Sequence, residues 1–200
     1  MKLDLVTMVR PVKAAMKEAS ERASVRRLHV FLDRIKCRAG CSSCCSRMIH
    51  VSVAEALVMH ESLIASGKWP EVRKRAVAQK PVAASASPMA WFKMNIKCPV
   101  LEDGMCGAYD VRPTPCSTHF AESDPSLCDP WGTASGEYSP VQMNDIHDEF
   151  MRALEGLVDG HGILAYRMPI SSALLFAEGI RVMTGLSIEE LTGILRSELR

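Results

Sequence analysis

Eight cysteines are the residues of this 200-residue chain best suited to do chemistry, and they fall into two groups. The first group is a C-x3-C-x2-C-C cluster of Cys37, Cys41, Cys44 and Cys45, and the second is the wider set of Cys98, Cys106, Cys116 and Cys128. Thiolate sulfur is a soft ligand that suits zinc and iron–sulfur centres, and a short loop gathers several thiolates at little cost in chain entropy. All eight cysteines are therefore predicted metal ligands. The metal is either an iron–sulfur cluster, for which a 4Fe–4S cluster is one candidate, or Zn²⁺.

The spacing of the first group limits how it can bind metal. A helix through residues 37–45 would spread the four sulfurs over about 12 Å, which is too far for one zinc ion with Zn–S bonds of about 2.3 Å. Gly40 and two serines favour a folded-back loop instead. Because Cys44 and Cys45 are neighbours whose side chains diverge, we expect one of them to bind a different atom from the other, or none. Two zinc sites of four thiolates each remain an open alternative.

Disulfides and free thiols explain the cysteines less well. Residues 1–10 include Lys2, Asp4 and Arg10 and lack the apolar stretch of a signal peptide, and no segment approaches the roughly 20 apolar residues of a membrane helix. We therefore expect a cytoplasmic protein, in which thiols stay reduced. A chain of this length can bury a core without the roughly 2–4 kcal/mol that a disulfide adds. Thiol–disulfide exchange is a weaker alternative, because no βαβ pattern surrounds the cysteines.

Few other residues point to a particular chemistry. His50 and His119 lie near cysteines and are candidates to complete a site, although a lone histidine more often has a structural role. Arg112 is expected either to offset thiolate charge or to form a surface ion pair. The formal net charge of +1 gives no electrostatic case for nucleic acid or a membrane as partner. No nucleotide-binding loop or H-E-x-x-H motif is present, so the sequence leaves open whether the protein is an enzyme.

The periodicity predicts a mostly α protein, a small helical domain with an irregular cysteine-rich metal-binding region. We divide it into an N-terminal helical segment (1–36), a cysteine-rich metal-binding region (37–131) and C-terminal helices that pack on the same domain (132–200). The first expected helix spans residues 12–32, with Pro11 in its first turn, and the second is capped by Ser52 and Glu55 and stopped by Gly67. Further helices are expected over residues 71–80, from Asn144 or Asp145 to Leu157, and from Ser171 or Ser172 to near Gly185, with a last short one capped by Ser187. Residues 81–88 are expected to form a linker, and residues 97–131 an irregular stretch that metal would organise.

The combined motif resembles a known family, the CxxxCxxCC (YkgJ-like) family of zinc- or iron-chelating proteins. The resemblance covers about residues 37–128 and is carried by Cys37, Cys41, Cys44, Cys45, Cys98, Pro99, Leu101, Cys106, Tyr109, Arg112, Pro113 and Cys116, with Cys128 matching a later cysteine. It implies an iron–sulfur or zinc protein, and relatives of the family include a flagellin lysine methylase with an iron–sulfur centre. Where the family usually has an arginine, this chain has Ser117.

Two functions follow from these observations. The first is a metal-binding protein with an iron–sulfur cluster or zinc and a redox, iron-handling or protein-modifying role. The second is a zinc-organised interaction module without catalysis, since zinc contributes roughly 10–16 kcal/mol of apparent binding free energy. The implied partner is a metal ion or cluster, together with a protein partner or substrate that the sequence does not identify.

Overall fold

The computed structural model describes residues 5–38, 40–132, 135–158, 162–182, 190, 193–194 and 197, and this part of the chain is mostly helical. The α-helices are α1 (Leu5–Arg26), α2 (Val53–Ala65), α3 (Trp69–Ser85), α4 (Pro88–Lys93), α5 (Thr114–Ser117), α6 (Asn144–Leu157), α7 (Gly162–Ala165) and α8 (Ile170–Val182). The strands are β1 (His50–Ser52), β2 (Leu101–Glu102), β3 (Met105–Cys106), β4 (His119–Ala121), β5 (Pro140–Gln142) and β6 (Arg167–Pro169). Short π or 3₁₀ turns are η1 (Arg27–Phe31), η2 (Leu32–Arg34), η3 (Ser43–Ser46), η4 (Tyr109–Val111) and η5 (Pro125–Cys128).

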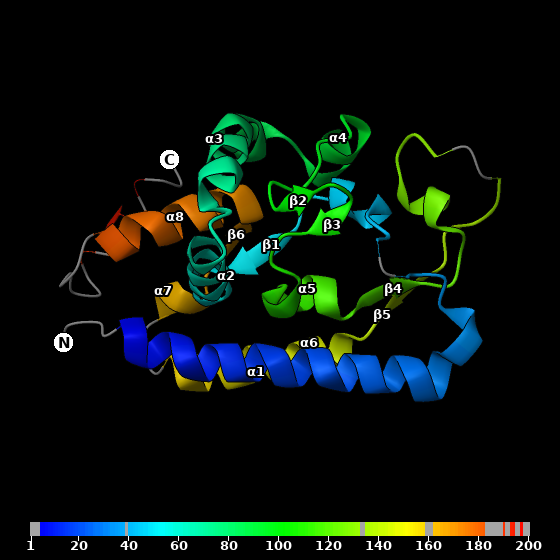
Figure 1. Ribbon diagram of the computed structural model, residues 1–200, viewed down its shortest axis with the longest axis horizontal. Coiled ribbons are helices and arrows are strands. Elements are labelled where there is room, and N and C mark those ends of the chain that lie inside the picture. The colour runs from blue at the N-terminus through cyan, green and yellow to red at the C-terminus, as the bar shows by residue number, and fades with distance from the viewer. Residues whose placement is uncertain are drawn as a thin grey trace.

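Helix α1 runs along one edge of the molecule and packs against α6 and α2 (Figure 1). Its buried face repeats every three or four residues, through Val9, Val12, Met16, Ala19 and Ala23. The expected start near residue 12 was wrong, because the helix begins at Leu5 and Pro11 lies inside it. An interior proline costs roughly 3 kcal/mol, and the continuous buried stripe on both sides of it offsets that cost.

Helix α2 forms as the sequence predicts and lies at the centre of the fold. Ser52 and Glu55 make a complete capping box at its start. At its end Gly67 takes a φ of +70°, and its backbone N–H donates to the carbonyl of Ile64. Helix α2 packs on α8, and strand β1 before it pairs with β6 before α8, so the two helices leave one short ribbon together.

The expected linker over residues 81–88 was wrong. Helix α3 continues through Pro81 to Ser85, and only two residues separate it from α4, where the Ser87 hydroxyl accepts from the N–H of Ala90. Alanines favour the helical state, and burial of Ala83 and packing of α3 on α8 keep the segment ordered.

The C-terminal part agrees with the expectations in part. The helix predicted from Asn144 or Asp145 to Leu157 is α6, which begins at Asn144. Neither Ser171 nor Ser172 caps α8, because the helix already begins at Ile170 and the Ser171 hydroxyl is buried without a partner. Gly185 and the short helix expected after Ser187 lie outside the described residues, apart from isolated positions.

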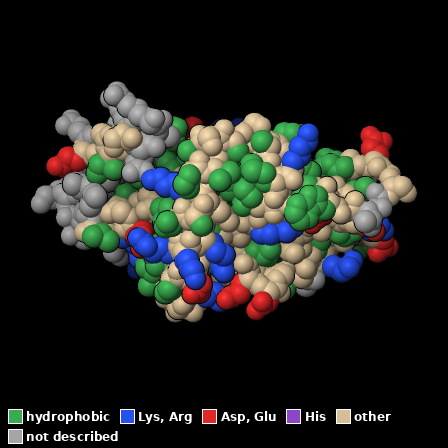
Figure 2. Space-filling view, turned by 90° about the horizontal axis from the view of Figure 1, so that it is seen from above, with side chains coloured by type: hydrophobic (Ala, Val, Ile, Leu, Met, Phe, Trp, Pro, Cys, Tyr) green, Lys and Arg blue, Asp and Glu red, His purple; other side chains and the backbone are tan. Residues whose placement is uncertain are grey.

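The stretch over residues 97–131 is largely irregular, as expected, and contains a few short strands and helical turns. Strands β2 and β3 form a hairpin whose turn residues, Asp103 and Gly104, both have positive φ, as a two-residue turn of this kind requires. Strands β4 and β5 form a second ribbon. Seen from above, over α3 and α4, the surface carries apolar groups beside lysines and arginines, with acidic groups toward its edges (Figure 2). In the described part of the chain, no helix has the length and apolar character to cross a bilayer.

Candidate metal centre

Cysteines from both groups line one cavity of about 750 Å³. Six of the eight lie on its wall: Cys41, Cys44, Cys45, Cys98, Cys106 and Cys116. They come from η3 and the loop before it, from the β2–β3 hairpin region, and from α5. Segments more than 50 residues apart in the sequence therefore meet at one place, and all eight cysteines are free thiols.

Cys37 and Cys128 lie beside this cavity rather than on its wall. The Cys37 sulfur accepts a hydrogen bond from the backbone N–H of Ala121, at 3.3 Å. Cys128 is buried on η5, which packs against η3. Burial, together with the nearby charges of Cys44 and Cys37, raises the pKa of Cys128 to about 11. The eight cysteines thus form one connected set, with Cys44 near its middle.

The thiol pKa values separate Cys44 from the others. The Cys45 thiol donates a hydrogen bond to the Cys44 sulfur, which lowers the pKa of Cys44 to about 6 and raises that of Cys45. The guanidinium groups of Arg47 and Arg112 also lower the pKa of Cys44. Burial raises the pKa of Cys98 to about 12. In the metal-free protein Cys44 therefore ionises more readily than Cys45 and Cys98.

Burial is the main reason that the pKa values of three further cysteines are raised. Burial raises the pKa of Cys37, Cys106 and Cys116, and for Cys116 the charges of Cys98, Cys44 and Cys106 add to that effect. Bringing thiolates together without a cation is unfavourable, since like charges repel and burial removes their hydration. A bound cation would reverse this, because it stabilises the deprotonated form.

Lys97 ties three cysteine segments together. Its ammonium group donates to the Ser46 hydroxyl at 2.7 Å and pairs with Asp129 at 3.0 Å. Ser46 follows Cys45, Lys97 precedes Cys98, and Asp129 follows Cys128. The backbone N–H of Cys98 also donates to the carbonyl of Cys45, at 2.7 Å. Sequence reasoning missed this role of Lys97, because nothing in its sequence neighbours indicates partners 51 and 32 residues away.

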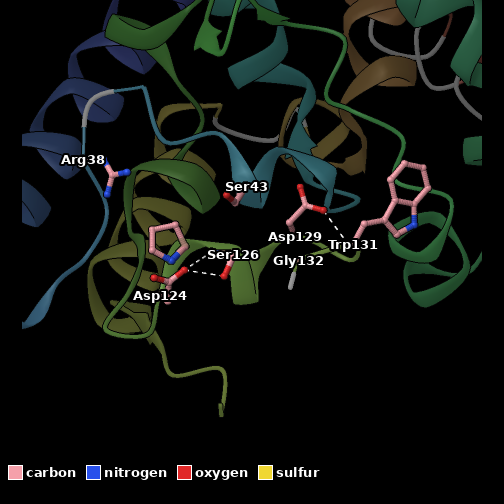
Figure 3. A pocket seen from close by; sticks show the side chains of 8 residues that line it. Arg38, Ser43, Asp124, Ser126, Asp129, Trp131 and Gly132 are labelled. Atoms are coloured by element: carbon pink, nitrogen blue, oxygen red, sulfur yellow. Dashed lines mark hydrogen bonds between the residues drawn. The ribbon is translucent and has the colours of Figure 1, made fainter. Parts of the chain in front are cut away.

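Hydrogen bonds within its own loop hold η5 and therefore Cys128. The Asp124 carboxylate caps η5 by accepting from the N–H and hydroxyl of Ser126, and Asp129 accepts from the N–H of Trp131 (Figure 3). These residues and Arg38 line a second hollow, of about 430 Å³, that no cysteine borders. At Gly132 an added Cβ would stand 1.7 Å from the carbonyl oxygen of Ser126, so only glycine fits there.

The position of Cys116 depends on a buried carboxylate. Glu55 is fully buried and accepts hydrogen bonds from the N–H and hydroxyl of Ser52, at 2.9 and 2.8 Å. Its other oxygen accepts from the N–H and hydroxyl of Thr114, both at 2.8 Å. Glu55 thereby joins the start of α2 to α5, the short helix that carries Cys116.

The structure separates the other candidates named from the sequence. His119 lines the cavity, but Gln142 and Tyr138 hydrogen-bond its two ring nitrogens, at 2.7 and 2.9 Å. His50 lies on β1 and borders a different, smaller pocket. Ser117 is buried within α5, and its hydroxyl donates to the carbonyl of Thr114. Arg112 lines the cysteine cavity, so the surface ion pair considered for it does not occur in the described part of the chain.

The cysteines surround a space wider than one ion. Among the residues that the structure describes, no three histidine, cysteine, aspartate or glutamate side chains stand close enough to hold a single metal ion. The described residues on the cavity wall include no carboxylate. Cysteine sulfur is therefore the ligand type that the cavity offers. The sulfur atoms are spread around the cavity wall rather than gathered about one position where a single ion could bind.

A mostly helical fold whose irregular segments bring clustered thiols to one cavity is typical of a thiolate metal-binding domain. The family model CxxCxxCC, described as a putative zinc- or iron-chelating domain, matches residues 36–137, slightly more than half of the chain. The chain belongs to this family. No curated protein and no solved structure matches it.

Proposed function

We propose that this protein holds an iron–sulfur cluster through thiolates at the wall of the cysteine cavity. The observation that carries the proposal is the convergence of six cysteines, from both sequence groups, on a volume of about 750 Å³. Such a cluster is held by four cysteine thiolates. Its ligands lie farther apart than the ligands of one zinc ion, because a cluster contains several metal and sulfide atoms. When bound, it would give and accept single electrons.

The chain supplies suitable ligands and suitable surroundings. Cys45, Cys98, Cys106 and Cys116 lie on the wall, and the charges of Cys98 and Cys116 act on Cys45, so we assign these four as the first ligand set. Cys44 faces the same cavity, and Cys37, Cys41 and Cys128 act on one another electrostatically. In this assignment Cys44 belongs to a second set with Cys37, Cys41 and Cys128, so that Cys44 and Cys45 would bind different atoms. The two arginines on the wall would offset the charge of a thiolate-bound centre.

Anaerobic purification separates this proposal from a structural-zinc module. The expected result is brown protein that contains iron and acid-labile sulfide, absorbs visible light and bleaches in air. Replacing Cys45 or Cys116 by serine should remove most of the visible absorption, and a Ser66→Ala variant, changed on the surface at the end of α2, should retain it. Colourless protein with stoichiometric zinc and no sulfide would contradict the cluster and support the zinc alternative.

A further inference from the structure

Two half-buried arginines on the cavity wall each have a buried side-chain nitrogen without a hydrogen-bond partner. Arg47 and Arg112 both line the cysteine cavity, and the Nε atom of each is buried without a hydrogen-bond acceptor. Neither forms an ion pair with a carboxylate in the described part of the chain. A buried donor left unpaired is costly, and a native structure usually supplies an acceptor or binds one.

Aromatic rings fix the positions of both guanidinium groups. The guanidinium of Arg47 lies over the ring of Tyr138, at 4.6 Å from its centroid, and over that of Phe92, at 5.5 Å. The guanidinium of Arg112 lies 4.4 Å from the ring centroid of Tyr109. Contacts of this kind orient the planar group without using its N–H donors. The hydrogen bond from the Tyr138 hydroxyl to His119 holds the ring under Arg47 in turn.

The rest of the wall is mostly apolar, and its described residues include no carboxylate. Its apolar members include Met48, Ile49, Pro88, Met89, Phe92 and Leu127. The volume of about 750 Å³ falls within the range of about 300–1,000 Å³ that is typical of small-molecule pockets. Such pockets combine an apolar lining with a few fixed polar groups that orient the ligand.

From these observations we infer that the cavity binds an organic carboxylate beside the metal centre, with the carboxylate on Arg47 and Arg112 and an apolar body against the methionine- and phenylalanine-lined wall. Arginine forms paired hydrogen bonds to a carboxylate, which a neutral alcohol of the same size cannot accept in the same way. The inference rests on the proposed function only in placing a metal centre next to the bound carboxylate. The guanidinium groups and the apolar wall belong to the chain itself.

Calorimetric titration with sodium hexanoate tests the inference, with 1-hexanol and hexylammonium chloride as neutral and cationic analogues of the same length. The expected result is stoichiometric hexanoate binding that is at least about tenfold tighter than binding of either analogue. Arg47→Gln and Arg112→Gln should each weaken hexanoate binding about tenfold or more. Arg152→Gln, the same change at an exposed position of α6, should leave it unchanged. Circular dichroism establishes that each variant is folded.

A second measurement needs no variant. In ¹⁵N-arginine-labelled native protein, hexanoate should shift two arginine Nε–H resonances, those of buried groups, and hexanol should shift neither. Both experiments are run on reduced metal-free protein as well as on metal-loaded protein. Absence of metal from the purified protein would therefore overturn the proposed function without deciding this inference.

Two outcomes would overturn the inference. Equal binding of hexanoate and hexanol would show that the wall selects for apolar character alone. Gln variants that change the visible absorption of the metal centre and leave hexanoate affinity unchanged would show that the arginines serve only the centre.

Discussion

At the scale of single residues, Lys97 is the side chain on which the meeting of the cysteine segments depends most directly. It contacts a residue next to Cys45 and a residue next to Cys128, and it adjoins Cys98. Both contacts are charge-assisted and partly shielded from water. Because the Lys97 side chain is 42% exposed, water weakens these contacts, and an ion pair of this kind contributes up to about 1 kcal/mol. Loss of Lys97 should still loosen three cysteine-bearing segments at once.

We predict that Lys97→Met lowers the metal content of purified protein by half or more, while helical content stays near that of the native protein. Metal analysis and far-ultraviolet circular dichroism measure the two quantities. Lys74→Met, which removes the same charge from an exposed position of α3, is the matched control. Equal metal content in the Lys97 variant and the control would show that Lys97 does not organise the centre.

His60 gives a prediction about stability that is independent of metal. It is 2% exposed, its ring meets that of Trp69 edge-on at 4.3 Å, and neither ring nitrogen has a hydrogen-bond partner. Burial, helped by the charge of Arg181, lowers the pKa of His60 to about 4. Above about pH 6.5 the imidazole is neutral in folded and unfolded chains alike. Between pH 6.5 and 4 the unfolded chain gains a proton that the folded chain does not.

The free energy of unfolding should therefore fall as pH falls from about 6.5 to 4, by a His60 contribution on the order of 3 kcal/mol. Urea denaturation of metal-free protein at several pH values measures it. His60→Leu should flatten this part of the profile, and His29→Gln, at an exposed histidine, should not. An unchanged slope in His60→Leu would contradict the assignment of the neutral form.

At the scale of elements, the loop that carries η5 has a strict requirement for glycine. The Gly132 N–H donates to the carbonyl of Asp129, and a Cβ at residue 132 would overlap the Ser126 carbonyl. Gly132→Ala should therefore displace η5 and move Cys128 away from η3. Because Asp129 belongs to the same loop, the ion pair with Lys97 should weaken as well.

We predict that Gly132→Ala makes the Cys128 thiol react faster with a maleimide reagent, identified by mass spectrometry of the labelled peptide, and lowers the thermal midpoint. Gly156→Ala is the control, because an added Cβ there meets nothing within 4 Å. Within helix α6 that change should stabilise the fold by roughly 0.5–1 kcal/mol. Similar labelling rates in the two variants would refute the close-approach argument.

Local sequence signals predicted the elements that local interactions determine. The Ser52–Glu55 box and helix α6 could be found because capping and helical spacing each depend on a few neighbouring residues. Pro11 and Pro81 misled the prediction for the opposite reason. Packing of α1 and α3 against distant helices outweighs the local cost of a proline, and no local pattern reports it.

The candidate site shows the same division. The sequence was enough to predict that the two cysteine groups are metal ligands. Their meeting at one cavity depends on hydrogen bonds between residues far apart in sequence, such as Lys97 with Ser46 and Glu55 with Thr114. The role of Arg47 was also missed. Its ring partners, Phe92 and Tyr138, follow it by 45 and 91 positions, so the sequence gives no sign that they meet.

At the scale of the whole molecule, buried thiols link metal binding to proton release. The pKa of Cys98 is raised to about 12 and that of Cys128 to about 11, so these thiols are protonated near neutral pH in the metal-free protein. Metal binds the deprotonated form. Binding of a metal by Cys98 and Cys128 would therefore release these protons, and raising the pH would favour the bound state.

Apparent affinity for Zn²⁺, used here as a redox-inert probe, should rise between pH 6.5 and 8.5 by up to about tenfold per pH unit for each proton released. Competition with a chromophoric chelator of known pH behaviour measures it, under anaerobic reducing conditions. The Cys128→Ser variant should show a shallower rise than the native protein. A pH-independent affinity would mean that the ligand thiols are already ionised before metal arrives.

The triple contact of Lys97 has a consequence for how such a centre is gained and lost. One ammonium group fastens η3, the segment before β2 and the η5 loop, so displacement of any one of them loosens its hold on the other two. We therefore expect the cysteine ligands to bind and release metal together rather than one sulfur at a time. Partly loaded forms should then be scarce, and the protein should pass between empty and full in a single step.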